Sequence, residues 1–203
     1  MKLVTFRSAQ QQAPLLGEIV DDVLYQIGDG SLTMLDVISG KRNLPDERAA
    51  ILSSETLAPL RPGKILAIGR NYADHAAELK NTLPSKPLIF AKYPTCVIGD
   101  AEPIRWKTSI TQQVDWEVEL AVVIGKTAQD VSEAAAYAHV FGYTVANDIS
   151  ARDLQDTEGQ WTRAKAQDTF CPLGPCIVTR DDVPDPHTLT LRTEVNGEVM
   201  QDA

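Results

Sequence analysis

A single segment, residues 115–125, limits the possible folds of this chain more than any other feature. Its side chains alternate with period two, which is typical of a β-strand whose two faces meet different surroundings. One face carries four apolar side chains: Trp116, Val118, Leu120 and Val122. The other face begins with two carboxylates and continues with two apolar side chains: Glu117, Glu119, Ala121 and Val123. The fold must therefore hold two neighbouring carboxylates on one face of a sheet.

Residues 1–60 predict a small N-terminal domain of strands and short helices. Its expected elements are strands at residues 2–7 and 17–27 and helices at residues 34–38 and 46–52. A pair of aspartates at residues 21–22 interrupts the second strand and favours a tight turn. A stretch rich in proline and glycine at residues 59–63 then breaks the pattern. We place a domain boundary there, so that residues 61–203 form the second domain.

The sequence of the second domain predicts a mixture of strands and helices. The expected elements are strands at residues 64–68, 88–92, 115–125, 143–146, 189–195 and 198–201, and helices at residues 71–79 and 131–140. Asp130 is expected to cap the second helix, with Glu133 completing a capping box, and Gly142 is expected to end it. An Asn-Gly pair at residues 196–197 predicts a hairpin between the last two strands, since Asn-Gly favours the type I′ turn. The whole pattern indicates an α+β chain.

The charge balance excludes several classes of function. The chain has 28 acidic and 19 basic side chains, a formal net charge of −9, whereas sequence-independent binding to nucleic acid or to an anionic membrane requires a basic surface. No apolar run approaches the roughly 18 residues of a membrane span, and the N-terminal segment does not resemble a secretory signal. The three cysteines show no C-x-x-C spacing and are expected to be free thiols. We therefore expect a cytoplasmic protein that binds neither nucleic acid nor membrane.

Glu117 and Glu119 predict a site for a hard metal ion. Two strand steps separate their side chains by roughly 6–7 Å, and carboxylates that close repel each other unless a cation lies between them. The ligands are oxygens with no Cys or His beside them, which favours Mg²⁺, Mn²⁺ or Ca²⁺ over zinc. Asp148, at the end of the strand after the predicted helix, offers a third carboxylate. The alternative is that both glutamates lie on a solvated strand face, and the sequence leaves that alternative open.

Two further patterns contain residue types used in catalysis. His75 and Glu78 lie three residues apart in a predicted helix and share a face, and a carboxylate beside an imidazole orients it and raises its basicity. Such a pair is also common on protein surfaces. Lys165 follows Trp161 among apolar residues, and a partly desolvated lysine stabilises an enolate or an oxyanion. Taken alone, however, its surroundings favour an ordinary surface lysine.

Together these residues resemble the fumarylacetoacetate hydrolase family, in four motifs that occur in the family's order. Residues 69–75 are similar to the segment G-x-N-Y-x-x-H, and residues 117–125 to the strand E-x-E-L-x-x-V-I-G. Residues 147–155 are similar to the signature N-D-x-[ST]-A-R-D-x-Q, and residues 165–175 to the stretch K-x-x-D-x-[FS]-x-P-x-G-P. The resemblance covers roughly residues 60–203. The N-terminal part is similar, less distinctively, to the small first domain of bacterial members.

The resemblance implies a fold, a metal centre and a set of site residues. The implied fold is a mixed β-roll with flanking helices, and members are usually homodimers. Glu117, Glu119 and Asp148 would bind Mg²⁺ or Mn²⁺, with Ca²⁺ as an alternative in crystals. The other implied site residues are the catalytic His75, Glu78 and Lys165 and the substrate-binding Arg70, Tyr72, Arg152 and Gln155.

The resemblance also implies a substrate class, the 2-oxo acids and 1,3-dicarbonyl compounds. It favours metal-dependent hydrolysis of the C–C bond in 2,4-dioxo acids of the acylpyruvate or fumarylacetoacetate type. A decarboxylase of oxaloacetate, or an isomerase/decarboxylase of aromatic catabolism, is the alternative. Family members normally continue past the hairpin into a G-D-x-I-x-T-G-T-P segment, which this sequence does not contain. A truncated chain that binds metal without turnover is therefore a third hypothesis.

Overall fold

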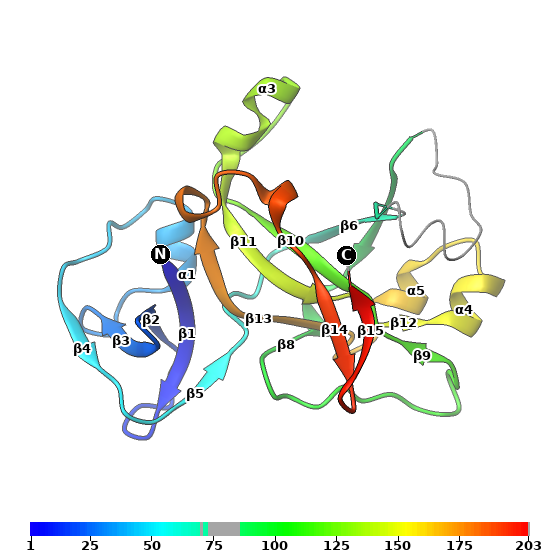
Figure 1. Cartoon of the computed structure of the whole chain (residues 1–203), viewed down its shortest axis with the longest axis horizontal. Coiled ribbons are helices and arrows are strands. Elements are labelled where there is room, and N and C mark those ends of the chain that lie inside the picture. The colour runs from blue at the N-terminus through cyan, green and yellow to red at the C-terminus, as the bar shows by residue number, and fades with distance from the viewer. Residues whose placement is uncertain (70, 73–85, 203) are drawn as a thin grey trace.

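Nine strands form one continuous sheet in the part of the computed structural model that is described, residues 1–69, 71–72 and 86–202. The strand order is β10-β11-β13-β1-β2-β3-β4, with β5 paired to β1 and β8 paired to β13. Its strands are β1 (Lys2–Ser8), β2 (Leu15–Val20), β3 (Val23–Ile27), β4 (Arg48–Ala50), β5 (Ser54–Leu57), β8 (Val97–Ile98), β10 (Val118–Ile124), β11 (Val140–Asn147) and β13 (Cys171–Thr179). Figure 1 shows β1 to β5 gathered on one side of the molecule, with β10, β11 and β13 running through its middle.

In the same described residues, six more strands pair into three small sheets. These are β6 (Ile65–Gly69) with β7 (Leu88–Lys92), β9 (Val114–Asp115) with β12 (Ser150–Ala151), and β14 (Arg192–Val195) with β15 (Glu198–Asp202). The helices are short: α1 (Met34–Ile38), α3 (Glu133–Ala136), α4 (Arg152–Thr157) and α5 (Thr162–Lys165). Single 3-10 turns lie at η1 (Pro94–Cys96), η2 (Tyr137–His139), η3 (Arg180–Asp182) and η4 (Pro186–Thr188). The chain is mostly sheet with few helices, which confirms the predicted α+β class.

The N-terminal strands follow the sequence alternation except at one segment. β1, β2 and β3 pair antiparallel, and Asp21 and Asp22 adopt φ values of 49° and 61° in the turn between β2 and β3, as a type I′ turn requires. The helix predicted at residues 46–52 is wrong. Residues Arg48–Ala50 form β4 instead, because pairing with β3 overrides the helical propensity of two alanines.

β1 joins the N-terminal strands to the rest of the large sheet by pairing with β13. β11 lies on the other side of β13, and Gly142 of β11 lets these two strands approach closely. A Cβ at Gly142 would overlap the carbonyl oxygen of Val178 on β13. Gly142 therefore serves strand packing and does not end a helix, contrary to the prediction. The domain boundary at residue 60 stays a prediction.

The helix expected at residues 131–140 is much shorter than predicted. α3 forms one turn and passes directly into η2. Asp130 has a φ of 52° and lies outside the helix, while Ser132 holds the N-cap position without a side-chain hydrogen bond. Most side chains of this segment are exposed. A longer helix is not stabilised because it has no apolar face packed on the protein.

The C-terminal hairpin forms as predicted and is attached to the start of β10. Asn196 and Gly197 adopt φ values of 53° and 85° in its turn. The side-chain oxygen of Gln201 on β15 accepts a hydrogen bond of 2.9 Å from the N–H of Val118. The hairpin thereby covers the end of β10 at which the two glutamates lie.

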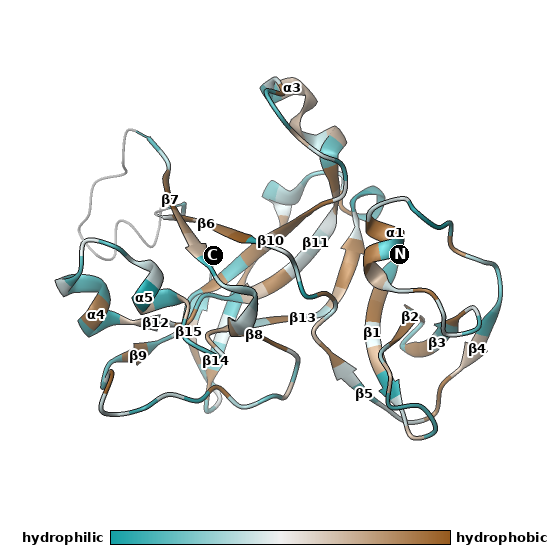
Figure 2. Cartoon of the chain, turned by 180° about the vertical axis from the view of Figure 1, so that it is seen from behind, coloured by the Kyte–Doolittle hydropathy of each residue, from teal (hydrophilic) through white to brown (hydrophobic). Residues whose placement is uncertain are grey.

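The buried core supports the middle of the large sheet and the region beneath the acidic residues. Phe170, which is 0% exposed, packs there with Ile149, which precedes β12, and with neighbours from β12, α5 and η1: Ala151, Ala164 and Cys96. Figure 2 shows the apolar residues concentrated on the strands and the hydrophilic residues on loops and helix ends. All three cysteines are free thiols, as predicted. Among the described residues, no helix is long and apolar enough to span a bilayer.

Candidate metal centre

The three predicted acidic ligands meet at one end of the β10–β11 pair. Val118, the first residue of β10, is paired with Asn147, the last residue of β11. Asp148 follows immediately, and its N–H donates to the carbonyl oxygen of Glu117 at 2.8 Å. Ligand oxygens of Glu117, Glu119 and Asp148 all lie within 4.8 Å of one another. Antiparallel pairing of two strand ends therefore assembles one cluster of three carboxylates.

The strand predicted at residues 115–125 is broken just before β10. Glu117 lies in the break, where its N–H donates to the side-chain oxygen of Asn147 at 3.1 Å. The side chain of Glu117 is only 15% exposed and that of Asp148 is 2% exposed. Glu119 is also partly buried. The carboxylates therefore do not lie on a solvated strand face, the alternative that the sequence left open.

Two buried lysines pair with the carboxylate cluster. Lys165, the last residue of α5, donates from Nζ to Oε2 of Glu117 at 2.7 Å and to Oδ2 of Asp148 at 2.8 Å. Its side chain is 2% exposed, and Nζ lies 5.5 Å from the centre of the Phe90 ring. Lys92, the last residue of β7, donates to Oδ1 of Asp148 at 2.5 Å. Lys165 is thus buried beside the acidic cluster and is not the surface lysine that its local sequence alone favours.

Arg152 pairs with Glu117 through the second oxygen of that carboxylate. Its Nη1 donates to Oε1 of Glu117 at 2.5 Å and to Oε1 of Gln155 at 2.8 Å. Its Nε donates to Oδ2 of Asp115 at 2.8 Å. Ser150 Oγ lies 3.3 Å from the same Oε1 of Glu117. The N-terminal turn of α4 thus brings Arg152 and Gln155, both named by the sequence, beside the acidic cluster.

The surroundings shift the pKa values of Glu119 and Glu117 in opposite directions. Burial, followed by the charges of Asp148 and Glu117, raises the pKa of Glu119 from 4.5 to about 8. Glu117 is desolvated too, but Lys165 and Arg152 outweigh its burial and hold its pKa below the usual 4.5. Within residues 1–69, 71–72 and 86–202, no ion pair reaches Glu119. Lys165 and Lys92 lower the pKa of Glu119, but less than burial and the two carboxylates raise it.

The donor set suits a hard divalent cation. In the described part of the chain the cluster presents carboxylate oxygens alone, with no imidazole or thiolate among its members, as Mg²⁺ and Mn²⁺ prefer. Such a cation would also stabilise the ionised form of Glu119, whose pKa is raised by burial and by the neighbouring carboxylates. The three residues therefore fit the metal that the sequence predicted.

The remaining predicted site residues lie on the segment after β6. Three of them fall outside the described residues: Arg70, His75 and Glu78. Tyr72 is described, and its hydroxyl accepts a hydrogen bond of 2.9 Å from the N–H of Leu120. Burial raises the pKa of this hydroxyl. Tyr72 is thereby fixed to the strand residue that follows Glu119.

Sequence reasoning missed two residues that contact the site, Lys92 and Asp115. Lys92 ends the apolar strand β7, and a lysine that is fully buried is almost always paired. That signal does not name the partner, because Asp148 lies 56 positions away. No local pattern marks Asp115, because its partner Arg152 lies 37 positions away.

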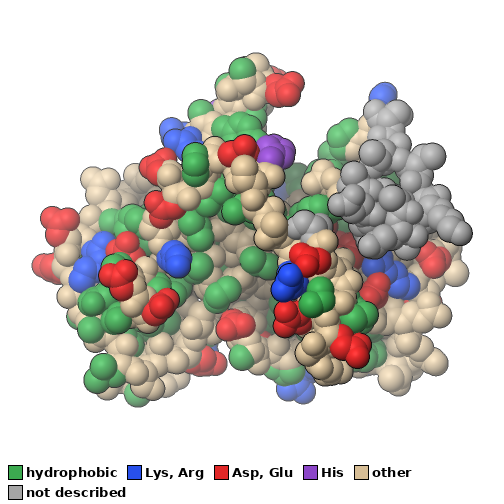
Figure 3. Space-filling model, viewed as in Figure 1, with side chains coloured by type: hydrophobic (Ala, Val, Ile, Leu, Met, Phe, Trp, Pro, Cys, Tyr) green, Lys and Arg blue, Asp and Glu red, His purple; other side chains and the backbone are tan. Residues whose placement is uncertain are grey.

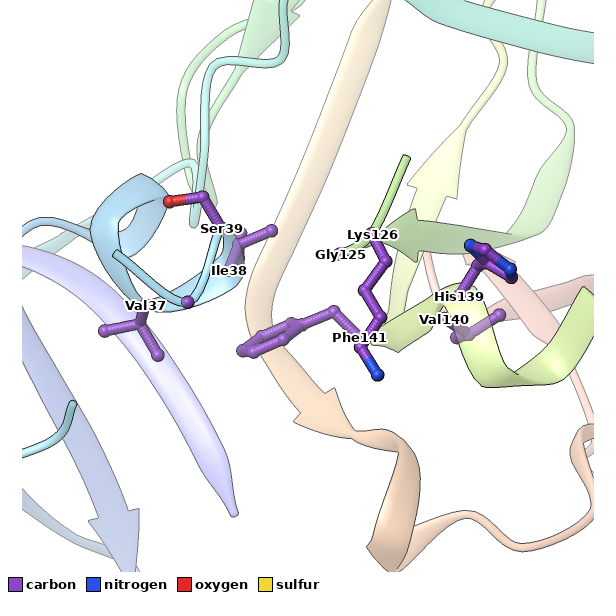
Figure 4. Close-up of a pocket in the computed structure, with 9 residues that line it drawn as sticks. Val37, Ile38, Ser39, Gly125, Lys126, His139, Val140 and Phe141 are labelled. Carbon is purple, nitrogen blue, oxygen red and sulfur yellow. The ribbon is translucent and has the colours of Figure 1, made fainter. Parts of the chain in front are cut away.

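A separate cavity lies at the opposite end of β10 from Glu119. It has a volume of about 160 Å³ and lies between α1 and the start of β11, with Ile38, Lys126, His139 and Phe141 among its lining residues. Figure 4 shows these side chains converging from the two parts of the chain. None of the three carboxylates lines this cavity.

On the described surface seen in Figure 3, basic side chains are interspersed with acidic ones.

Comparison with known proteins identifies the family of this chain. A family model described as "Fumarylacetoacetate (FAA) hydrolase C-terminal" matches residues 64–203. A mitochondrial oxaloacetate tautomerase from Xenopus laevis is 40% identical over 225 residues, covering 100% of this chain and 69% of the relative. Across eight curated relatives, this chain spans 47–69% of their length.

Solved structures share the fold over 100% of this chain. A fumarylacetoacetate hydrolase from Exiguobacterium antarcticum has a TM-score of 0.87 and 35% identity, with 75% of its chain covered. A 5-carboxymethyl-2-hydroxymuconate delta-isomerase from Mycobacterium smegmatis has a TM-score of 0.83 and 39% identity, with 75% covered. A maleylpyruvate hydrolase from Sphingobium, in complex with manganese(II) and pyruvate, has a TM-score of 0.77 and 28% identity, with 76% covered. The similar proteins thus include hydrolases, an isomerase and a tautomerase.

Proposed function

Because the chain belongs to the fumarylacetoacetate hydrolase family, we propose that it is a divalent-metal-dependent enzyme that converts 2-oxo acids through their enol or enolate forms. The observation that carries the proposal is the cluster of Glu117, Glu119 and Asp148, whose ligand atoms lie within 4.8 Å of one another. Mg²⁺ or Mn²⁺ held there would bind the carboxylate and 2-oxo oxygens of the substrate and stabilise negative charge on the 2-oxo oxygen. The Sphingobium structure with manganese(II) and pyruvate supports this substrate class.

Lys165 is the proposed proton donor and oxyanion partner. Its Nζ is held between Glu117 and Asp148 at 2.7 and 2.8 Å, so it faces the same space as the carboxylate ligands. An ammonium group in such a dry position stabilises an enolate oxygen strongly. It also holds a proton that can pass to the enolate carbon. We assign substrate-carboxylate binding to Arg152 and Gln155, which are joined by a hydrogen bond of 2.8 Å.

The preferred reaction is keto–enol interconversion of an oxaloacetate-type 2-oxo dicarboxylate. Curated relatives that are 40% and 48% identical carry the name oxaloacetate tautomerase. The reaction moves one proton between C3 and the 2-oxo oxygen and consumes no water. The groups that it needs are an acid–base residue and a means of stabilising the enolate oxygen. The acidic cluster and Lys165 supply both.

The tautomerase proposal is tested by following the ultraviolet absorbance of the oxaloacetate enol. With Mn²⁺ present, the full chain should speed the decay of this absorbance. EDTA should abolish the acceleration, and Glu119→Gln or Lys165→Met should reduce it by about 100-fold or more. Lys107→Met, which alters an exposed lysine, is the matched control and should leave the rate unchanged. An acceleration that survives EDTA or Glu119→Gln would refute the proposal.

Hydrolysis of the C–C bond in 2,4-dioxo acids is the second candidate function. Two of the similar structures are hydrolases by name, and the sequence places His75 and Glu78 at the spacing of a base that activates water. Hydrolysis needs that water, whereas tautomerisation and decarboxylation do not. Pyruvate release from acetylpyruvate should therefore disappear in His75→Ala if hydrolysis is the reaction. Oxaloacetate tautomerisation or decarboxylation should persist in the same variant.

Assembly and location remain proposals as well. We propose a homodimer in the cytoplasm that binds neither nucleic acid nor membrane. Sedimentation of the 22.2 kDa chain tests the dimer, because a monomeric mass would refute it. The third hypothesis, metal binding without turnover, requires that Mn²⁺ binds and that none of these substrates is converted.

A further inference from the structure

Lys92 is a buried cation to which neither the sequence motifs nor the proposed reaction assigns a role. It is 3% exposed at the end of β7. Its Nζ donates to Oδ1 of Asp148 at 2.5 Å and to the carbonyl oxygen of Lys165. Burying an ammonium group is unfavourable unless its hydrogen atoms find partners. The two acceptors are both parts of the candidate metal centre.

The contact with Asp148 fixes the orientation of its carboxylate group. Lys165 Nζ bridges Oδ2 of Asp148 and Oε2 of Glu117, so Oδ2 is the oxygen on the Glu117 side. Lys92 holds the other oxygen, Oδ1. Each oxygen thus has its own lysine, and rotation of the carboxylate would break both contacts. The Asp148 side chain is 2% exposed, so bulk water cannot replace these contacts.

The contact with the Lys165 carbonyl fixes the end of α5. This helix has four residues, and its last carbonyl has no partner within the helix. Lys92 supplies that partner. Phe90, two residues earlier on the same face of β7, packs beneath Lys165 Nζ and meets Trp161 edge-on at 5.5 Å. β7 therefore supports both the main chain and the side chain of Lys165.

We propose that Lys92 is a positioning residue of the metal centre, which holds the Asp148 carboxylate and the Lys165 main chain in the arrangement that binds the cation. The proposal rests on the proposed metal-dependent function. When Lys92 is removed, this proposal and a simple charge effect predict opposite changes in cation affinity. By Coulomb's law alone, removing a positive charge next to a cation site tightens cation binding. Loss of a positioning contact weakens it, since groups that orient metal ligands commonly contribute 10–100-fold to affinity.

The experiment is a Mn²⁺ titration of the full chain, with bound Mn²⁺ followed by electron paramagnetic resonance. Lys92→Met should raise the dissociation constant about 10–100-fold and change the spectrum of the bound ion. Lys92→Arg, which keeps the charge and the donors, should recover part of the affinity. Lys107→Met is the matched control and should bind like the unsubstituted chain.

The outcomes separate this inference from the proposed function. No saturable Mn²⁺ binding by the unsubstituted chain would overturn the metal centre and this inference together. Equal or tighter binding by Lys92→Met would overturn the inference alone. If circular dichroism shows that the methionine variant does not fold, Lys92→Gln replaces it; its shorter side chain cannot bridge Asp148 and the Lys165 carbonyl as Lys92 does, so its dissociation constant should rise as well. An unchanged dissociation constant in the folded glutamine variant would likewise overturn the inference.

Discussion

Replacement of Glu119 by glutamine measures how far a buried, ionised carboxylate lowers the free energy of unfolding of the metal-free chain. Burial, Asp148 and Glu117 raise the pKa of Glu119 from 4.5 to about 8. The folded chain therefore holds this proton more tightly than the unfolded chain, and the free energy of unfolding falls as pH rises from 4.5 to 8. At 1.36 kcal/mol per pKa unit, the loss is about 3 kcal/mol at pH 7 and about 5 kcal/mol well above pH 8. Glutamine cannot ionise, so the free energy of unfolding of the variant does not fall with pH for this reason.

Urea unfolding in EDTA, followed by tryptophan fluorescence from pH 5 to pH 9, measures the effect. The unsubstituted chain should lose stability across this range by about 3–5 kcal/mol more than Glu119→Gln does. Glu133→Gln, at an exposed position on α3, is the control and should follow the unsubstituted chain. Parallel pH profiles for the unsubstituted chain and Glu119→Gln would refute the reasoning.

Other conditions and substitutions test the neighbouring parts of the site and the fold. The apparent Mn²⁺ affinity should fall about tenfold for each pH unit below 8, because Glu119 must release its proton on binding; calorimetry that finds no pH dependence between pH 6 and 8 would contradict this. Lys165→Met removes the cation that bridges Glu117 and Asp148 and should lower the free energy of unfolding in EDTA by about 3–5 kcal/mol, with Mn²⁺ restoring part of it. Gly142→Ala should cost about 1–3 kcal/mol in urea unfolding, because its Cβ would overlap the carbonyl oxygen of Val178; an unchanged midpoint would show that β11 moves freely away from β13.

The acidic cluster could be predicted from the sequence because its chemistry is local. Two glutamates at a spacing of two point the same way along one strand, and Asp148 follows the strand that pairs with it. Burial of the cluster could not be predicted from spacing alone, since it depends on the lysines that approach from β7 and α5. Only the family motif, and not its local surroundings, indicated that Lys165 belongs to the site.

Tertiary pairing explains the elements that sequence patterns missed. Residues 46–52 contain good helix formers, but β3 offers a strand edge, and Arg48–Ala50 pair with it. The alanine-rich segment after Asp130 has helical propensity without an apolar face to bury, so one turn forms. Lys92 was missed because its partner, Asp148, is distant in sequence. Contacts of this kind follow from the fold and not from any short segment.

Calorimetric titration of Mn²⁺ into the unsubstituted chain and Asp148→Asn at pH 8 tests the central claim most directly. The claim is that Glu117, Glu119 and Asp148 form one divalent-metal centre. We expect about one Mn²⁺ per chain, and an affinity about 100-fold or more weaker in the variant, because a neutral amide replaces a charged ligand. Equal affinity in the two chains, or no saturable binding by the unsubstituted chain, would contradict the claim.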